Sequence, residues 1–98
     1  MHISTAADAL GQARCLEVRY DGYARVVEVH ACGYTREGHA VMRVWQVSGG
    51  GVSGERSGWK LLRLDEARAL SILPERSRAP RNGYRRGDSA MARLVAQV

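Results

Sequence analysis

Apolar and polar residues alternate along most of the chain between residues 15 and 73, a pattern typical of strands with one buried face. The alternation is clear in residues 15–20. Asp21-Gly22, directly after this segment, is a two-residue hairpin signal that places Tyr20 opposite Tyr23. Further turn and Gly/Ser-rich stretches separate the segments that follow. The pattern predicts five strands, at residues 15–20, 24–32, 40–47, 59–64 and 69–73.

Apolar residues recur at helical spacing at the two ends of the chain. Residues 1–14 are predicted as a helix, and Thr5 and Asp8 fit a capping box, with a hydroxyl at the N-cap and a carboxylate three residues later. Near the other end, Asp88 is a candidate N-cap. For residues 89–98 we predict a helix, with a strand as the alternative.

The length of 98 residues fits one domain with one core. Five short strands with close connections predict a mainly β (α+β) fold: a small, partly open five-stranded β-barrel or strongly bent sheet, with the N-terminal helix over one end. The single domain, residues 1–98, is divided into a helix at 1–14, a β-barrel core at 15–73, and an Arg-rich loop with a C-terminal segment at 74–98.

The distribution of apolar residues and cysteines limits the location and the cofactors. No apolar run is long enough to span a membrane, and the first residues lack the features of a secretory signal, so we expect a cytoplasmic protein with no membrane contact. Cys15 and Cys32 form no C-x-x-C pair, and we expect two buried free thiols. With only two cysteines and three histidines, we expect no metal site and no cofactor.

The positive charge is concentrated in one segment. Five arginines with no acid between them equal the whole formal net charge of +5. Such a segment can neutralise phosphates and bind nucleic acid in a salt-dependent way, or it can be a solvated face without a partner. The candidate nucleic-acid-binding residues are Arg76, Arg78, Arg81, Arg85 and Arg86.

The third and fourth predicted strands flank the Gly-rich loop at residues 48–58 and are expected to pair antiparallel. Arg43 and Trp45 then share one face of the third strand, and Trp59 and Arg63 share one face of the fourth. If both faces point the same way, two indoles lie beside two guanidiniums, which suits a nucleotide, a base step or an aromatic acid. In the alternative, the indoles belong to the core and the arginines pair with Glu28 and Asp65.

We find no pattern that predicts an enzyme. Gly49 and Gly54 have the spacing of a phosphate-binding loop, but Glu55-Arg56 replaces the required Lys-Ser/Thr, and a strand follows where a helix is needed. The segment around Ser53 lacks the spacing of a nucleophile elbow. His30 has no nucleophile placed near it by local sequence.

Two segments, residues 25–30 and 58–65, together with Gly38 at the start of the third strand, resemble the WYL domain family over roughly residues 16–73. The namesake Trp-Tyr-Leu falls here on Ala-Val-Met at residues 40–42, and the usual Phe falls on Leu62. The resemblance implies an Sm-like β-barrel and a sensor role, usually behind a DNA-binding helix-turn-helix that this sequence does not show. It implies a basic pocket for nucleic acid or another ligand, with candidates Arg25, His30, Arg43 and Arg63.

These observations together predict a non-enzymatic, ligand-sensing regulatory module that binds an anionic or nucleotide-type ligand. Arg25, Arg43 and Arg63 would contact the anion, and Trp45 or Trp59 would stack on the ring. One alternative is salt-dependent binding of short nucleic acid through the Arg76–Arg86 segment. Another is a structural module that pairs through an open sheet edge, as a homodimer or with a regulatory protein partner.

Overall fold

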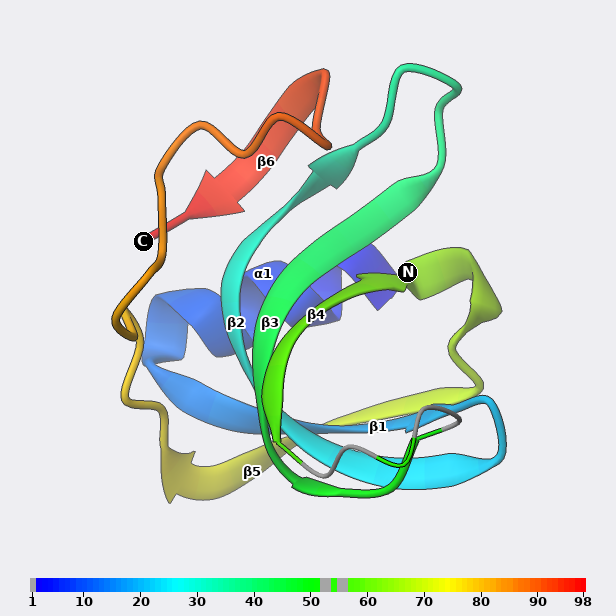
Figure 1. The fold of residues 1–98 in the computed structure, drawn as a ribbon, viewed down its shortest axis with the longest axis vertical. Helices are drawn as coiled ribbons and strands as arrows, with labels where there is room; N and C mark the ends of the chain where they lie inside the picture. Colours follow the sequence, from blue (N-terminus) through cyan, green and yellow to red (C-terminus); the bar gives the residue numbers. More distant parts are fainter. Residues whose placement is uncertain (1, 52–53, 55–56) are drawn as a thin grey trace.

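The computed structural model describes residues 2–51, 54 and 57–98. One helix precedes six strands, and a short 3-10 helix, η1, lies between the fourth and fifth strands (Figure 1). In chain order the elements are α1 (His2–Gln12), β1 (Arg14–Tyr20), β2 (Tyr23–Tyr34), β3 (Ala40–Gly49), β4 (Gly58–Arg63), η1 (Leu64–Glu66), β5 (Ala69–Arg76) and β6 (Arg93–Gln97).

The strands form one antiparallel sheet in the order β4-β3-β2-β1-β5, and β6 also pairs with β2. The long strand β2 serves two neighbours along one edge, β1 along its first half and β6 along its last four residues. Two register shifts in its pairing with β3 accompany the strong bend seen in Figure 1. The sequence prediction of a mainly β domain is confirmed.

The predicted five-stranded barrel needs two corrections. The sheet has six strands, and no pairing among the described residues joins β4 to β5, so it is not closed into a barrel. β4 ends at Arg63, where the chain turns through η1. The phenol of Tyr20, at the end of β1, contacts this turn: it accepts a hydrogen bond from the Arg63 N–H (3.2 Å) and donates one to Glu66 Oε1 (3.1 Å). Side-chain hydrogen bonds thus join the end of β1 to the end of β4 and to η1.

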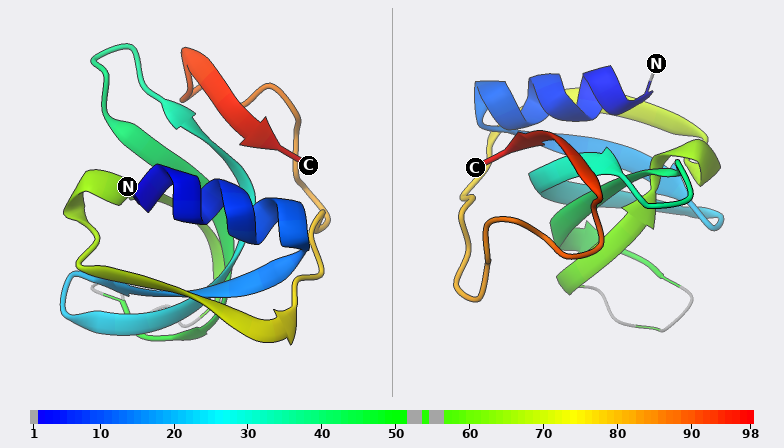
Figure 2. Two further views of the ribbon diagram at one scale, coloured as in Figure 1. Left: turned by 180° about the vertical axis from the view of Figure 1, so that it is seen from behind. Right: turned by 90° about the horizontal axis from the view of Figure 1, so that it is seen from above.

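Helix α1 covers the concave side of the bent sheet (Figure 2). Ile3, Ala6 and Ala9, spaced three residues apart, are buried against the sheet. Because Ile3 belongs to this face, the helix already begins at His2, and Thr5 lies inside the helix and not at its start. The predicted capping box of Thr5 and Asp8 is therefore wrong.

The main core lies between α1 and the sheet. It is built from alternate residues of the strands, which confirms the pattern seen in the sequence. The hairpin register with Tyr20 opposite Tyr23 is also confirmed. Cys15 and Cys32 are both buried and free, and burial raises the pKa of each thiol. The central buried side chains of the sheet are Leu16, Val18, Val27, Val29, Met42, Val44 and Leu62.

Several boundaries differ from the prediction. Strand β5 runs through Pro74 to Arg76, which an edge strand tolerates because its outer N–H groups need no partner. The predicted loop at residues 48–58 is shortened, since β3 continues to Gly49 and β4 begins at Gly58. Ser53 and Glu55-Arg56, where the catalytic-loop comparisons fell, lie outside the described residues. No helix among the described residues has the length and apolar character needed to cross a bilayer.

The predicted helix at residues 89–98 is not formed, and the strand considered as its alternative is found as β6, Arg93–Gln97. β2 extends beyond the reach of β1 and offers unpaired backbone groups at Ala31–Tyr34, and β6 pairs with them. Asp88 does cap a local structure, because its carboxylate accepts a hydrogen bond from the Ala90 N–H at 2.9 Å. That structure is a turn and not a helix.

Gly33 allows β6 to approach β2 closely. A Cβ atom at this position would lie 2.2 Å from the Arg93 carbonyl oxygen, so Gly33→Ala is expected to lower the free energy of unfolding by about 1–3 kcal/mol in urea denaturation. Gly11→Ala is the matched control. No atom lies within 4 Å of the Cβ added at Gly11, which is exposed on α1. This substitution is expected to raise the free energy of unfolding by about 1 kcal/mol. Equal stability of the two variants would contradict the proposed packing of β6.

Candidate functional site

Residues 77–91, here called the arginine arm, connect β5 to β6 and cross the outer face of the sheet, on the side away from α1 (Figure 2). The arm is fixed at both ends. Its first residue, Ser77, donates its N–H to the Ala13 carbonyl at 2.9 Å. Its last residue, Met91, is buried against Ala31 and Val41 in a small second core. The arm is therefore part of the folded domain.

Glu28 on β2 holds the middle of the arm. Its carboxylate is 1% exposed and accepts hydrogen bonds from Arg81 Nε (2.7 Å), Arg81 Nη2 (3.2 Å) and the Arg78 N–H (2.8 Å). Burial raises the pKa of Glu28, but these hydrogen bonds and the charge of Arg81 outweigh burial, and the resulting pKa lies below the ordinary value. Glu28 is thus an ionised, fully engaged anchor.

His30 is a second anchor for the arm and is fully buried. Its Nδ1 lies 3.0 Å from the Glu28 carbonyl oxygen, and its Nε2 lies 2.9 Å from the Arg81 backbone nitrogen. A carbonyl only accepts and an amide N–H only donates, so Nδ1 carries the proton and Nε2 accepts. Burial lowers the pKa of His30, and the charge of Arg81 adds to this effect. The imidazole is therefore neutral and structural.

Three rings of the strands, His30, Trp45 and Trp59, cluster with Tyr84 of the arm. Trp45 and Trp59 are directly paired across β3 and β4, with centroids 5.4 Å apart and planes nearly perpendicular. Trp59 also contacts His30 at 4.7 Å and lies nearly parallel to Tyr84 of the arm at 6.3 Å. The Arg81 guanidinium lies 5.4 Å from the centre of the Trp45 ring. The indoles share one face, as predicted, and this face is half-buried under the arm.

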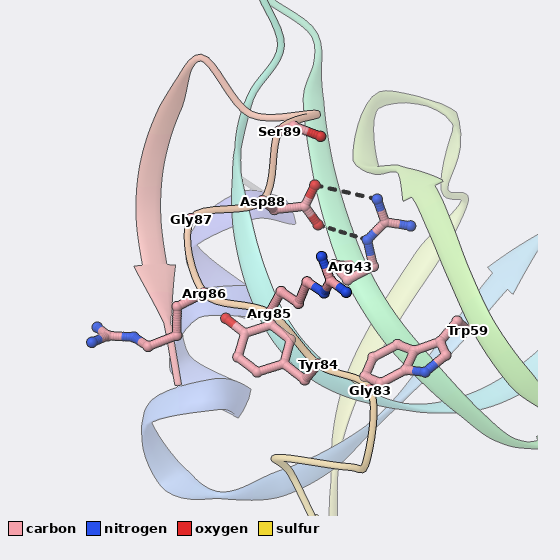
Figure 3. A pocket seen from close by; sticks show the side chains of 9 residues that line it. All are labelled: Arg43, Trp59, Gly83, Tyr84, Arg85, Arg86, Gly87, Asp88 and Ser89. Carbon is pink, nitrogen blue, oxygen red and sulfur yellow. Dashed lines mark hydrogen bonds and ion pairs between the residues drawn. The ribbon is translucent and has the colours of Figure 1, made fainter.

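A pocket of about 460 Å³ lies between the arm and the strands (Figure 3). On the strand side, Arg43 and Trp59 line it. On the arm side, Arg85 extends toward Arg43, whereas Arg86 points away. The other arm residues that line it are Gly83, Tyr84, Gly87, Asp88 and Ser89.

Asp88 already engages the guanidinium of Arg43. Two hydrogen bonds join them, from Nε to Oδ2 (2.6 Å) and from Nη2 to Oδ1 (3.2 Å). The Arg43 hydrogen bonds are the main cause of the lowered pKa of Asp88. Arg43 remains 29% exposed, while Asp88 is only 8% exposed. The pair forms one polar wall of the pocket, and the side chain of Arg85 extends toward it from the arm (Figure 3).

The structure separates the other predicted ligand contacts from this pocket. Arg63 is on the face of β4 that carries Trp59, but it pairs with Asp65 at 2.6 Å and with Glu66 at 3.4 Å and does not line the pocket. Arg25 is buried and lies directly opposite Val18 of β1, which places it on the core side of the sheet. His30 lies behind Trp59 and does not line the pocket either.

Of the five clustered arginines, one is half-buried and paired, and four are exposed. Arg81 is half-buried and holds the arm, with Glu28 as its partner. The sequence-based alternative pairs Glu28 with an arginine of the middle strands, and this pairing is not found among the described residues. The same alternative pairs Asp65 with such an arginine, and Arg63 does pair with Asp65. The exposed members are Arg76, at the end of β5, and Arg78, Arg85 and Arg86.

Sequence reasoning missed Tyr84 as a pocket residue and assigned Asp88 only a capping role. The one available signal was an aromatic residue directly before Arg85-Arg86 in an otherwise polar segment. The hydroxyl of Tyr84 is buried without a hydrogen-bond partner among the described residues, and burial raises its pKa. This ring is a built part of the pocket wall.

Fold and pocket together describe an open six-stranded β-sheet domain with a basic and aromatic pocket on its outer face. Comparison of the chain with protein-family models, with curated proteins and with solved structures found no match. The resemblance to the WYL family therefore stays a prediction. Within the described part of the chain, no three His, Cys, Asp or Glu side chains are grouped to hold a metal ion.

Proposed function

We propose that the chain is a ligand-binding module whose outer pocket takes a small molecule with an aromatic ring and an anionic group. The observation that carries this proposal is the convergence of Trp59, Tyr84, Arg43 and Arg85 on one pocket of about 460 Å³. This volume lies in the ordinary range of small-molecule sites, about 300–1,000 Å³. A nucleoside monophosphate or an aromatic acid has the size and chemistry to fit.

The pocket charges favour an anion. Arg43 and Arg85 direct their guanidiniums to it, Arg86 lines it but points away, and the one aspartate, Asp88, is already neutralised by Arg43. Arg85 is exposed and in no ion pair with a described residue, so its guanidinium can form two parallel hydrogen bonds to a phosphate or carboxylate. Trp59 and Tyr84 supply the flat apolar surface for a ring.

We propose a sensing role and not a catalytic one. Acid–base catalysis needs a carboxylate or imidazole that can exchange protons with a substrate. The groups of this kind closest to the pocket, Asp88, Glu28 and His30, are held by Arg43, by Arg81 and by the Arg81 N–H. Because these groups are already held in hydrogen bonds, they favour a pocket that binds a ligand without reacting with it. This agrees with the regulatory role that the WYL resemblance implies.

Titration with AMP, followed by tryptophan fluorescence, tests the proposal. AMP is expected to change the emission saturably, because it would stack on Trp59, and adenosine is expected to bind more weakly because it lacks the anion. Arg85→Gln should weaken AMP binding about tenfold, the value of one charge-assisted contact at an exposed site. Arg78→Gln, an exposed arm arginine outside the pocket, is the control. Equal affinities of the two variants would contradict the assignment.

A second candidate is binding of a nucleic-acid backbone along the arm. It is favoured by the four exposed arginines Arg76, Arg78, Arg85 and Arg86, none of which is ion-paired to a described residue. Backbone binding would depend on all four and fall steeply with salt. Pocket binding of AMP would depend on Arg85 and stay nearly unchanged in Arg78→Gln, so the same two variants separate the candidates.

A further inference from the structure

Arg25 on β2 is a buried cation that forms no ion pair within the described part of the chain. The residue is 4% exposed, and no carboxylate among the described residues lies within ion-pair distance of its guanidinium. A buried charge is normally paired, because removing it from water costs several kcal/mol. Arg43, Arg63 and Arg81, which are all less buried than Arg25, do have carboxylate partners.

The contacts of Arg25 with the described residues do not use all the donors of its guanidinium. Nη1 donates to Gln46 Oε1 at 3.4 Å, and Nη2 donates to the Tyr20 carbonyl oxygen at 3.3 Å. Both bonds are long, and Nε is buried without a hydrogen-bond partner among the residues that the structure describes. Nε–H and one of the two Nη2 protons lie on the same edge of a guanidinium, the edge that binds an oxyanion through two parallel hydrogen bonds, and Nη2 has a second proton for the Tyr20 carbonyl.

Two tyrosines flank the guanidinium. Its central carbon lies 5.2 Å from the centre of the Tyr20 ring and 5.9 Å from that of Tyr23. These rings attract the cation but do not balance its charge. The Tyr23 ring packs against Gly50, where a Cβ atom would lie 2.4 Å from the ring, and Tyr23 remains 41% exposed. Of the two rings, Tyr23 is therefore the one that can move toward solvent.

We propose that Arg25, with Tyr20, Tyr23 and Gln46, forms a second binding site, for a small oxyanion such as phosphate or a carboxylate. This site is independent of the outer pocket, because Arg25 lies on the core side of the sheet. The oxyanion accepts hydrogen bonds from Nε and Nη2 and supplies the missing negative charge. Tyr23 acts as the cover of the site.

Titration with inorganic phosphate, against sodium chloride at equal ionic strength, tests this site. The Nε–H NMR resonance of Arg25, assigned by its loss in Arg25→Lys, is expected to shift saturably. Half-saturation is expected at about 1–10 mM, the range for one bidentate ion contact. Tyr23→Ala should strengthen binding or speed exchange by uncovering the site. If the Arg25 resonance does not shift at phosphate concentrations up to about 50 mM, the proposal is overturned.

Two variants separate this site from the outer pocket. Phosphate is also expected to shift the ring resonances of Tyr23, because this ring covers the site. Arg25→Gln should abolish that shift, and Arg85→Gln should leave it unchanged. The opposite result, loss in Arg85→Gln alone, would assign phosphate to the outer pocket and overturn the Arg25 site. If Arg25→Gln does not fold, the wild-type Arg25 resonance still decides. AMP binding at Trp59 is a separate readout, so either proposal can fail alone.

Discussion

Replacing Arg81 with methionine is expected to lower the free energy of unfolding by about 3–5 kcal/mol, the cost of leaving a buried charge without its partner. Glu28 is 1% exposed, and Arg81 supplies two of the three hydrogen bonds that hold its carboxylate. Methionine keeps much of the length of the side chain but cannot donate. The measurement is urea denaturation at pH 7, followed by far-UV circular dichroism.

Arg78→Met is the matched control for this loss. Arg78 reaches Glu28 only through its backbone N–H, which methionine retains, so its loss should stay within about 0.5 kcal/mol, as for exposed substitutions in general. Glu28→Gln should be milder than Arg81→Met, because the Arg81 side chain is 27% exposed and can be rehydrated. Equal losses in Arg81→Met and Arg78→Met would contradict the view that Glu28 anchors the arm.

Mild acid is expected to weaken the same anchor through His30. Burial, with the Arg81 charge, lowers the pKa of His30 below the ordinary 6.5. The unfolded chain therefore takes up a proton before the folded protein does. The contribution of neutral His30 to the free energy of unfolding is complete above pH 6.5 and is lost as the pH falls through the pKa of the folded state. The free energy of unfolding then falls by up to about 1.4 kcal/mol per pH unit. Protonation would also place a proton on Nε2, where the Arg81 N–H now donates.

His30→Gln isolates this effect, because glutamine can both donate and accept but does not titrate in this range. The unfolding free energy of wild type should fall between pH 6.5 and 5 more steeply than that of His30→Gln. Glu28, the nearest carboxylate, has a lowered pKa, so its contribution is lost only at more acidic pH, below 4.5. Parallel pH curves for the two proteins would show that His30 does not bear on the stability of the arm.

Most strands of the sheet could be predicted because the patterns that determine them lie within short stretches of the sequence. Alternation along residues 15–20 and 40–47 fixes which face is buried, and Asp21-Gly22 fixes the hairpin register. The C-terminal strand could not be predicted in the same way. Met91, Leu94, Val95 and Val98 fit helix spacing, and the unpaired end of β2, not local preference, makes this segment a strand.

The candidate site was predicted only in part, because long-range contacts build it. Trp45 and Trp59 were expected on one face, and they meet there. The ion pair of Glu28 and Arg81 holds the arm on that face. These residues are 53 apart in the sequence, so no local pattern predicts their contact. Arg25 could have been separated from His30 by strand alternation, since an odd and an even residue of one strand face opposite sides. The register shift between Val29 and Ala31 makes that alternation less regular.

The most direct test of the central claim is the indole Nε1–H resonance of Trp59 in an AMP titration of wild-type protein. If the arm and the strands form a ligand pocket, this resonance should shift saturably while the main core, for example Val29 on the opposite face, stays unmoved. A Trp59 signal that does not respond to AMP, at concentrations that leave the fold intact, would contradict the account.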